Sequence, residues 1–284
     1  MPHERNNNVP ELYYLPTRPE GQLLAVSDLI YSLLQTVSED YGDGMNPQDQ
    51  QPNKRWLEYH NLLHSVEVYE TFLALAERAG LSRMATAVGA VAAAGHDIIQ
   101  EGTRGDMEYQ SGVLVGQELA NLGFSKYWQV VAHLAVIGTE PTYQDGVMAG
   151  QKVTKQQYPS PESEQIARLV ATADMASVYG PRGPLHSHQL YLETYAGPVG
   201  VVVPQTDMPA LHEFQHNTLD LVKNYQYPHL LGVKLSEIRR NDVVAYHKLV
   251  LEQIGSGEIT DWKQLLIKDR LFADCLTDTR IADS

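Results

Sequence analysis

The sequence feature that most constrains the fold is an alanine-rich run from Met84 to Ile99, which reads MATAVGAVAAAGHDII. Residues of this kind favour a helix, and the run is apolar on every side, which predicts a helix that neighbours bury all round. Its small side chains would let those neighbours approach closely. The run ends on His96 and Asp97, whose polar groups are costly to bury without partners. We therefore expect other polar residues of the chain to surround this end.

Composition narrows the class of protein. The 284 residues are 43% hydrophobic and 20% charged, as in globular proteins, and the net charge of −14 argues against a nucleic acid duplex or an anionic membrane as the main partner. No apolar run approaches the length of about 18 residues that spans a membrane, and the polar N-terminal arm predicts no signal peptide. The single cysteine, Cys275, fits a reducing compartment. We expect a soluble, cytoplasmic protein, for which the sequence leaves homo-oligomerisation open.

Helical signals dominate the chain, and no run of alternating strands is present, so the predicted class is all-α. We expect a single domain over residues 1–284, with a helical core at about 20–180 and a C-terminal helical extension at about 181–284. Long loops are predicted at 140–163 and 197–208, where they would shape a pocket. Helices are predicted over residues 23–41, 61–79, 84–99, 107–122, 126–138, 163–179, 185–195, 209–225, 235–254 and 259–273.

Several polar residues stand out against this helical background. His60 and His64 are four residues apart and share a helix face, as metal-binding pairs do, although an isolated pair of this kind is more often structural. His96 and Asp97 can reach one ion where their helix ends; the alternative is a histidine that the helix dipole favours. Asp174 lies within an apolar helix, where a carboxylate needs a cation or several hydrogen-bond donors.

These residues have compatible chemistry. His64, His96, Asp97 and Asp174 supply two imidazoles and two carboxylates, which neutralise a divalent cation and leave coordination positions for water. Mixed nitrogen and oxygen ligands suit Zn, Fe, Ni or Mn without choosing between them. A small phosphorylated substrate is compatible with an acidic chain, because a bound cation inverts the local charge.

The order His…His-Asp…Asp on consecutive helices resembles the HD superfamily of metal-dependent phosphohydrolases. The fuller pattern, Tyr59-His60-Asn61-x-x-His64 and then an alanine-rich helix ending in His96-Asp97, is similar to the cyclic-nucleotide phosphodiesterase branch and covers about residues 56–180. The resemblance implies a multi-helix HD-domain bundle that binds one or two divalent ions, from among Zn, Mn, Fe, Ni and Mg. The implied ligands are His64, His96, Asp97 and Asp174, with Asp97 bridging to a second ion.

The resemblance also implies an activity, the hydrolysis of a phosphomonoester or phosphodiester, in particular a nucleotide or cyclic nucleotide. Metal-activated hydroxide would attack, and His60 would be the general acid that protonates the leaving oxygen. A carboxylate often orients such a histidine, and Glu108 at the start of the next helix is our candidate; the alternative is a glutamate favoured near a helix N-terminus. The catalytic residues would then be His60, Asp97 and Glu108. The residues that contact substrate stay unidentified.

The sequence departs from the phosphodiesterase pattern after the HD pair, where Ile98 to Gly102 replaces the usual His-Pro-Gly and weakens a second metal site. One alternative function is a diiron HD-type oxygenase. Such proteins carry further histidines before the last aspartate, whereas this chain offers His133, which we interpret as a core residue. Another alternative is a non-catalytic regulatory module that binds a metal or nucleotide, for which His60 would be unnecessary. We interpret four further histidines as non-ligands: His186, His188, His212 and His216.

Overall fold

The computed structural model describes residues 21–43, 57–103, 105–144, 147–180, 182–196 and 208–278. Over these residues the chain is a bundle of α-helices with one short β-hairpin, which confirms the predicted all-α class. Among the described helices, none is both long enough and apolar enough to cross a membrane. The first helices are α1 (Gly21–Tyr41), α2 (Leu62–Ala79), α3 (Arg83–Gly95), α4 (Asp106–Asn121), α5 (Lys126–Ile137) and α6 (Pro161–Asp174).

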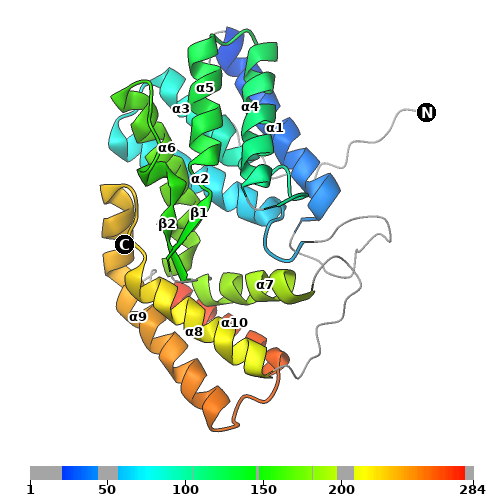
Figure 1. The fold of residues 1–284 in the computed structure, drawn as a ribbon, viewed down its shortest axis with the longest axis vertical. Coiled ribbons are helices and arrows are strands. Elements are labelled where there is room, and N and C mark those ends of the chain that lie inside the picture. The colour runs from blue at the N-terminus through cyan, green and yellow to red at the C-terminus, as the bar shows by residue number, and fades with distance from the viewer. Residues whose placement is uncertain are drawn as a thin grey trace, which may run out of the picture.

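The alanine-rich run forms α3, the central helix of this first group (Figure 1). Ser82 caps its start by accepting a hydrogen bond from the backbone N–H of Ala85 at 3.2 Å. The helix packs against α1, α2, α4, α5 and α6, and nearly all of its side chains are buried. It ends at Gly95, four residues before the predicted end, so His96 and Asp97 lie just beyond the last helical turn. The predicted buried helix is therefore confirmed.

Helix α2 runs antiparallel to α3 and approaches it closely. Asn61 caps the start of α2, and Gly80 ends it with a left-handed conformation of φ 68°. At Gly89 of α3 a methyl group would lie 2.1 Å from the ring of Phe72 in α2, so only glycine fits there at this spacing. The small residues of α3 therefore allow the close approach that the sequence predicted.

The segment predicted as a long loop at 140–163 contains an antiparallel hairpin of β1 (Pro141–Gln144) and β2 (Val147–Gln151), followed by the 3₁₀ turn η3 (Lys152–Thr154). The loop prediction was wrong here because the segment has only a few β-forming residues, too few for a clear alternating pattern. Backbone bonds from Lys152 to Glu140 at 2.8 Å and from Val153 to Gly138 at 3.0 Å fix the base of the hairpin to the end of α5.

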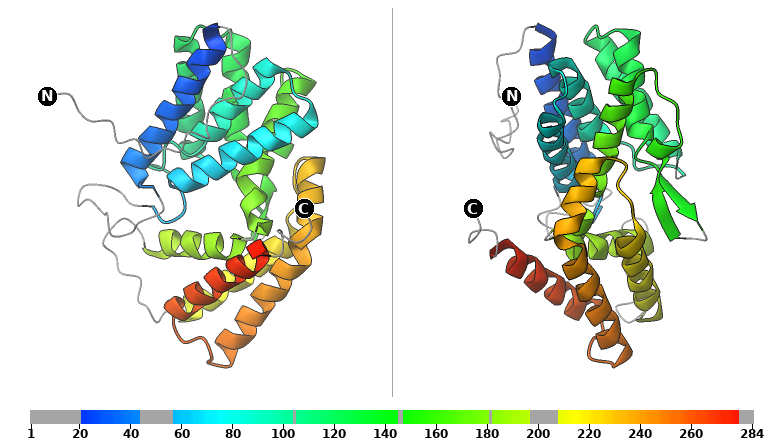
Figure 2. Two further views of the ribbon diagram at one scale, coloured as in Figure 1. Left: turned by 180° about the vertical axis from the view of Figure 1, so that it is seen from behind. Right: turned by 90° about the vertical axis from the view of Figure 1, so that its left-hand side faces the viewer.

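The C-terminal helices lie together beside one end of the first group, the lower part of Figure 1 and of the rotated views in Figure 2. They have their own apolar clusters, one around Tyr179, Val222 and Tyr225, another around Tyr191 and Leu265. The division at about residue 180 into core and extension stays a prediction. Residues 197–207 of the second predicted loop lie outside the described residues. The elements are the 3₁₀ turn η4 (Met175–Tyr179), α7 (Gly183–Ala196), α8 (Met208–Asn224), α9 (Leu230–Gly255) and α10 (Trp262–Asp278).

Candidate metal centre

Three helix ends meet at one place and bring the predicted ligands together. His64 lies in the first turn of α2, His96 directly follows α3, and Asp174 is the last residue of α6. One ligand atom from each of these three residues lies within 4.8 Å of the other two. Residues 110 positions apart in the sequence thus form one group that can hold a metal ion.

Asp97 completes the set of four side chains. Its Oδ2 atom lies 3.0 Å from Nε2 of His96 and 3.4 Å from Nε2 of His64. On the other side, Oδ1 of Asp174 lies 3.6 Å and 3.5 Å from the same two nitrogens. Each imidazole Nε2 therefore faces two carboxylate oxygens, one from each aspartate.

The chemistry of these donors fits a divalent cation. Nδ1 of His96 lies 2.9 Å from the carbonyl oxygen of Ala93, which can only accept, so Nδ1 carries the hydrogen and a neutral ring has its lone pair on Nε2. Within the described part of the chain, Nε2 of His64 and Nε2 of His96 are buried without a hydrogen-bond partner. A lone pair that faces carboxylate oxygens requires a proton or a cation between them. Two carboxylates balance a charge of +2.

Without an ion, the surroundings of His64 and His96 favour the protonated form of both imidazoles. Burial opposes a charge on His64 and His96, but the two aspartate carboxylates outweigh it and raise the pKa of both imidazoles. Burial likewise disfavours the charged carboxylates, yet the neighbouring histidines lower the pKa of Asp97 and Asp174. Protons and a divalent cation would therefore compete for the same nitrogen atoms.

His60 lies at the edge of this group, in the turn before α2. Its Nε2 is 3.9 Å from Oδ2 of Asp97, and a quarter of its side chain (25%) is exposed. Nδ1 of the ring contacts Oε1 of Glu193 in α7, while Oε2 of the same carboxylate accepts hydrogen bonds from the backbone N–H groups of Tyr59 and His60 at 2.9 and 3.0 Å. Glu193 thus fixes both the ring and the backbone of His60.

Glu193 also controls the protonation of His60. Burial opposes the imidazolium, but the carboxylates of Glu193 and Asp97 outweigh it and raise the pKa of His60 to about 9. A histidine with this pKa is protonated at neutral pH, on the open side of the group. The geometry therefore presents a proton donor next to residues that fit a metal ion.

The orienting contact that the sequence suggested for Glu108 is made by Glu193. Glu108 instead accepts a hydrogen bond from the backbone N–H of Gly105 at 2.8 Å, at the N-terminus of α4, which is the alternative considered above. Burial, together with the charges of Asp97 and Glu140, raises the pKa of Glu108. A catalytic role for Glu108 stays a prediction.

A second contact also escaped the sequence analysis. The side-chain amide of Gln151, at the end of β2, donates a hydrogen bond of 2.9 Å to Oδ2 of Asp174. Neither Gln151 nor Glu193 has a local sequence signal, because each contacts the centre through tertiary packing alone. The chain separation is 23 residues for Gln151 and 133 for Glu193.

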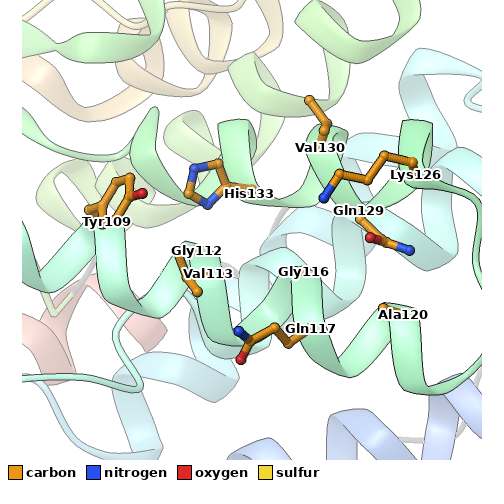
Figure 3. Close-up of a pocket in the computed structure, with 10 residues that line it drawn as sticks. All are labelled: Tyr109, Gly112, Val113, Gly116, Gln117, Ala120, Lys126, Gln129, Val130 and His133. Atoms are coloured by element: carbon orange, nitrogen blue, oxygen red, sulfur yellow. The ribbon is translucent and has the colours of Figure 1, made fainter.

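The other candidate residues lie away from the four ligands. His133 is half-buried beside Tyr109 rather than in the core, and it lines a cavity of about 240 Å³ between α4 and α5 (Figure 3). None of the residues that line this cavity belongs to the four ligands. Lys126 lies at one end of it.

The remaining histidines have other neighbours. His186 lies 3.4 Å from Glu67, which also pairs with Arg182, and His188 lies 3.2 Å from the buried Asp269. The other pair, His212 and His216, lies in α8, where the two rings meet edge to face with centroids 4.6 Å apart.

Comparison with known proteins gives one informative result. No family profile and no curated protein matches the sequence. Among solved structures, the crystal structure of Bacillus subtilis YpgQ in complex with ADP matches with a TM-score of 0.50 and 15% sequence identity. The match covers 82% of this chain and 96% of the YpgQ chain. At this identity the likeness shows that the two chains share a fold.

Proposed function

We propose that this protein is a metal-dependent phosphohydrolase of the HD type, which cleaves a phosphate ester bond of a nucleotide. The observation that carries the proposal is the place of His60, whose Nε2 lies 3.9 Å from Oδ2 of Asp97, beside two histidines and two aspartates that fit a divalent ion. Hydrolysis of an ester needs a proton donor next to the metal, whereas a site that only binds metal does not.

Two further observations support a nucleotide substrate. The order of His64, His96-Asp97 and Asp174 resembles that of the HD phosphohydrolases. This resemblance implies a nucleotide or cyclic nucleotide as the substrate. YpgQ, which shares the fold, was crystallised with ADP. The acidic surface of this chain makes a bound cation the natural counterpart for substrate phosphate.

In this proposal each residue has a defined task. His64, His96, Asp97 and Asp174 hold the ion, and a bound divalent ion lowers the pKa of a water molecule and neutralises charge on the phosphoryl oxygens. As water adds to phosphorus and the ester bond breaks, His60 transfers the proton on Nε2 to the leaving oxygen. Glu193 keeps the ring oriented through Nδ1 and stabilises its charge before the transfer.

The diiron oxygenase is the weaker alternative. That function needs further histidine ligands, and His133, the candidate between Asp97 and Asp174, faces Tyr109 in the cavity between α4 and α5. Iron analysis and oxygen consumption by the purified protein distinguish the two functions.

The decisive experiment combines metal analysis with a screen of nucleotides for phosphatase and phosphodiesterase activity. We expect His60→Ala to lower kcat by about 10²- to 10⁴-fold, the usual contribution of a general acid, with the metal content unchanged. His64→Ala should lose the metal. The exposed His216 of α8 provides the matched control, His216→Ala, with normal turnover. Full turnover by His60→Ala, or a wild-type protein that binds none of the added divalent ions, would overturn the proposal.

A further inference from the structure

Gln151 connects Asp174 to the C-terminal helices. The residue ends strand β2 and only 2% of it is exposed. Its amide nitrogen donates to Oδ2 of Asp174 at 2.9 Å and to the carbonyl oxygen of Thr139 at 3.3 Å. Its amide oxygen accepts a hydrogen bond of 2.6 Å from the hydroxyl of Tyr225, the residue that follows α8. A continuous path of hydrogen bonds thus leads from Tyr225 to Asp174.

The partners of Gln151 determine which way its amide points. Asp174 and the Thr139 carbonyl can only accept hydrogen bonds, so both must face the NH₂ group. The Tyr225 hydroxyl then donates to the remaining oxygen. A flipped amide would place its oxygen against two acceptors in a buried site, which is unfavourable. The orientation of Gln151 is therefore fixed from both ends.

Tyr225 is itself held firmly. Its side chain is fully buried among Tyr179, Val222 and Tyr227, and its carbonyl oxygen accepts a hydrogen bond of 2.9 Å from Arg240 in α9. Met148 of β2 packs against the same apolar cluster. The hairpin and the C-terminal helices therefore form one packed unit around the Gln151 amide.

The two carboxylate oxygens of Asp174 have different partners. Oδ1 faces Nε2 of His64 and of His96, whereas Oδ2 is occupied by Gln151. A carboxylate restrained in this way offers a single oxygen to the ion, in a fixed direction.

We propose that Gln151 is a positioning residue that holds Asp174 as a one-oxygen ligand of the metal centre, and that Tyr225 acts on the centre through Gln151. The inference rests on the metal centre of the proposed function. It gives the inserted hairpin a role, which is to link the ligand on α6 to the C-terminal helices.

The test measures Co²⁺ binding to the full chain by calorimetry and by visible absorption, which reports the geometry of the bound ion. Substitution of a residue that orients a metal ligand usually weakens metal binding by about 10- to 100-fold. We expect such a loss in Gln151→Met, which keeps the size but removes all three side-chain hydrogen bonds, together with an altered absorption spectrum. A dissociation constant within about threefold of wild type, with an unchanged spectrum, would overturn the inference.

The milder variant Tyr225→Phe keeps the packing and removes only the hydroxyl, so it tests the path even where Gln151→Met fails to fold. We expect a smaller loss of Co²⁺ affinity, of about 3- to 10-fold, within the usual range for one hydrogen bond. In the double variant, Tyr225→Phe should add nothing to Gln151→Met, because its effect passes through the amide. Additive effects would contradict the path.

Matched controls separate this path from a general loss of stability. Gln156→Met removes an amide that bonds Leu134 and Tyr158, and Tyr179→Phe removes a buried hydroxyl that bonds the carbonyl of Val222. Both should bind Co²⁺ as wild type does. Because binding is measured apart from turnover, the two proposals can fail separately. A protein that binds Co²⁺ in the expected manner without hydrolysing nucleotides refutes the proposed function alone, and normal binding by Gln151→Met refutes the inference alone.

Discussion

At the scale of single residues, protons and a divalent cation compete for the same atoms of the centre, Nε2 of His64 and Nε2 of His96. The raised pKa values of His64 and His96 mean that, when no ion is bound, both rings hold protons to a higher pH than ordinary imidazoles do. Each proton must leave before Nε2 can coordinate. Both rings are buried, with 3% and 1% of their side chains exposed.

This competition predicts the pH dependence of metal binding. A raised histidine pKa stabilises the metal-free protein at low pH, and this contribution disappears as the pH rises through the raised value. The affinity for a divalent ion should therefore increase with pH, by up to about tenfold per unit for each proton released. Calorimetry in buffers of different ionisation enthalpy counts the protons. An affinity for the divalent ion that does not rise with pH would contradict this competition.

A second prediction at this scale concerns Glu193. In Glu193→Gln the main charge that raises the pKa of His60 is gone, so this pKa should fall. A general acid must be protonated, so the decline of kcat/KM at high pH should move to lower pH. The pH–rate profile measures the shift. Glu67→Gln, which removes a carboxylate that contacts Arg182 instead, is the control, and its profile should match wild type.

At the scale of elements, the close contact between α2 and α3 supports the centre. A methyl group at Gly89 would lie 2.1 Å from the fully buried ring of Phe72, so the ring or the helices would have to shift. We expect Gly89→Ala to lower the free energy of unfolding by about 1–3 kcal/mol through overpacking, despite its better helix propensity. Gly255→Ala at the end of α9 meets no atom within 4 Å and should be neutral or slightly stabilising. Denaturant unfolding of both variants checks the difference.

The helices could be predicted because their signals are local. Helical spacing and caps such as Ser82 and Gly80 place α2 and α3 within a few residues of their observed bounds. The hairpin gave no such signal, since it has few β-forming residues, and contacts that the sequence does not reveal, such as that of Met148 with the C-terminal cluster, accompany it. The four ligands could be identified from residue types that are costly to bury. Glu193 and Gln151 could not, because the sequence near each is ordinary and their roles depend on contacts between distant elements.

At the scale of the whole molecule, the C-terminal helices hold both sides of the centre. Glu193 of α7 fixes His60, and Tyr225 after α8 reaches Asp174 through Gln151. The first group of helices therefore supplies the ligands, while the second group supplies their supports. Metal binding should be coupled to the packing of the two groups against each other.

This coupling predicts that a bound ion stabilises the whole fold. A divalent ion at 100 times its dissociation constant should add about 2.7 kcal/mol to the free energy of unfolding and raise Tm accordingly. Asp174→Asn retains the shape of the side chain but loses its charge, so most of this gain should disappear. Thermal unfolding with and without a chelator measures both effects. An equal gain in Asp174→Asn would show that the ion binds elsewhere.

The glycine at position 89 also determines helical phase. Gly89 and His96 are seven residues apart, almost two full turns, so both face α2, where Phe72 and His64 are eight residues apart. The contact between Gly89 and Phe72 fixes the distance between α2 and α3. The same helix pair carries the imidazoles of His64 and His96, whose ring centres lie 5.3 Å apart. One residue inserted between Gly89 and His96 would turn the imidazole by about 100° away from its partner. The chain length of this short segment is therefore as strictly constrained as the ligands themselves.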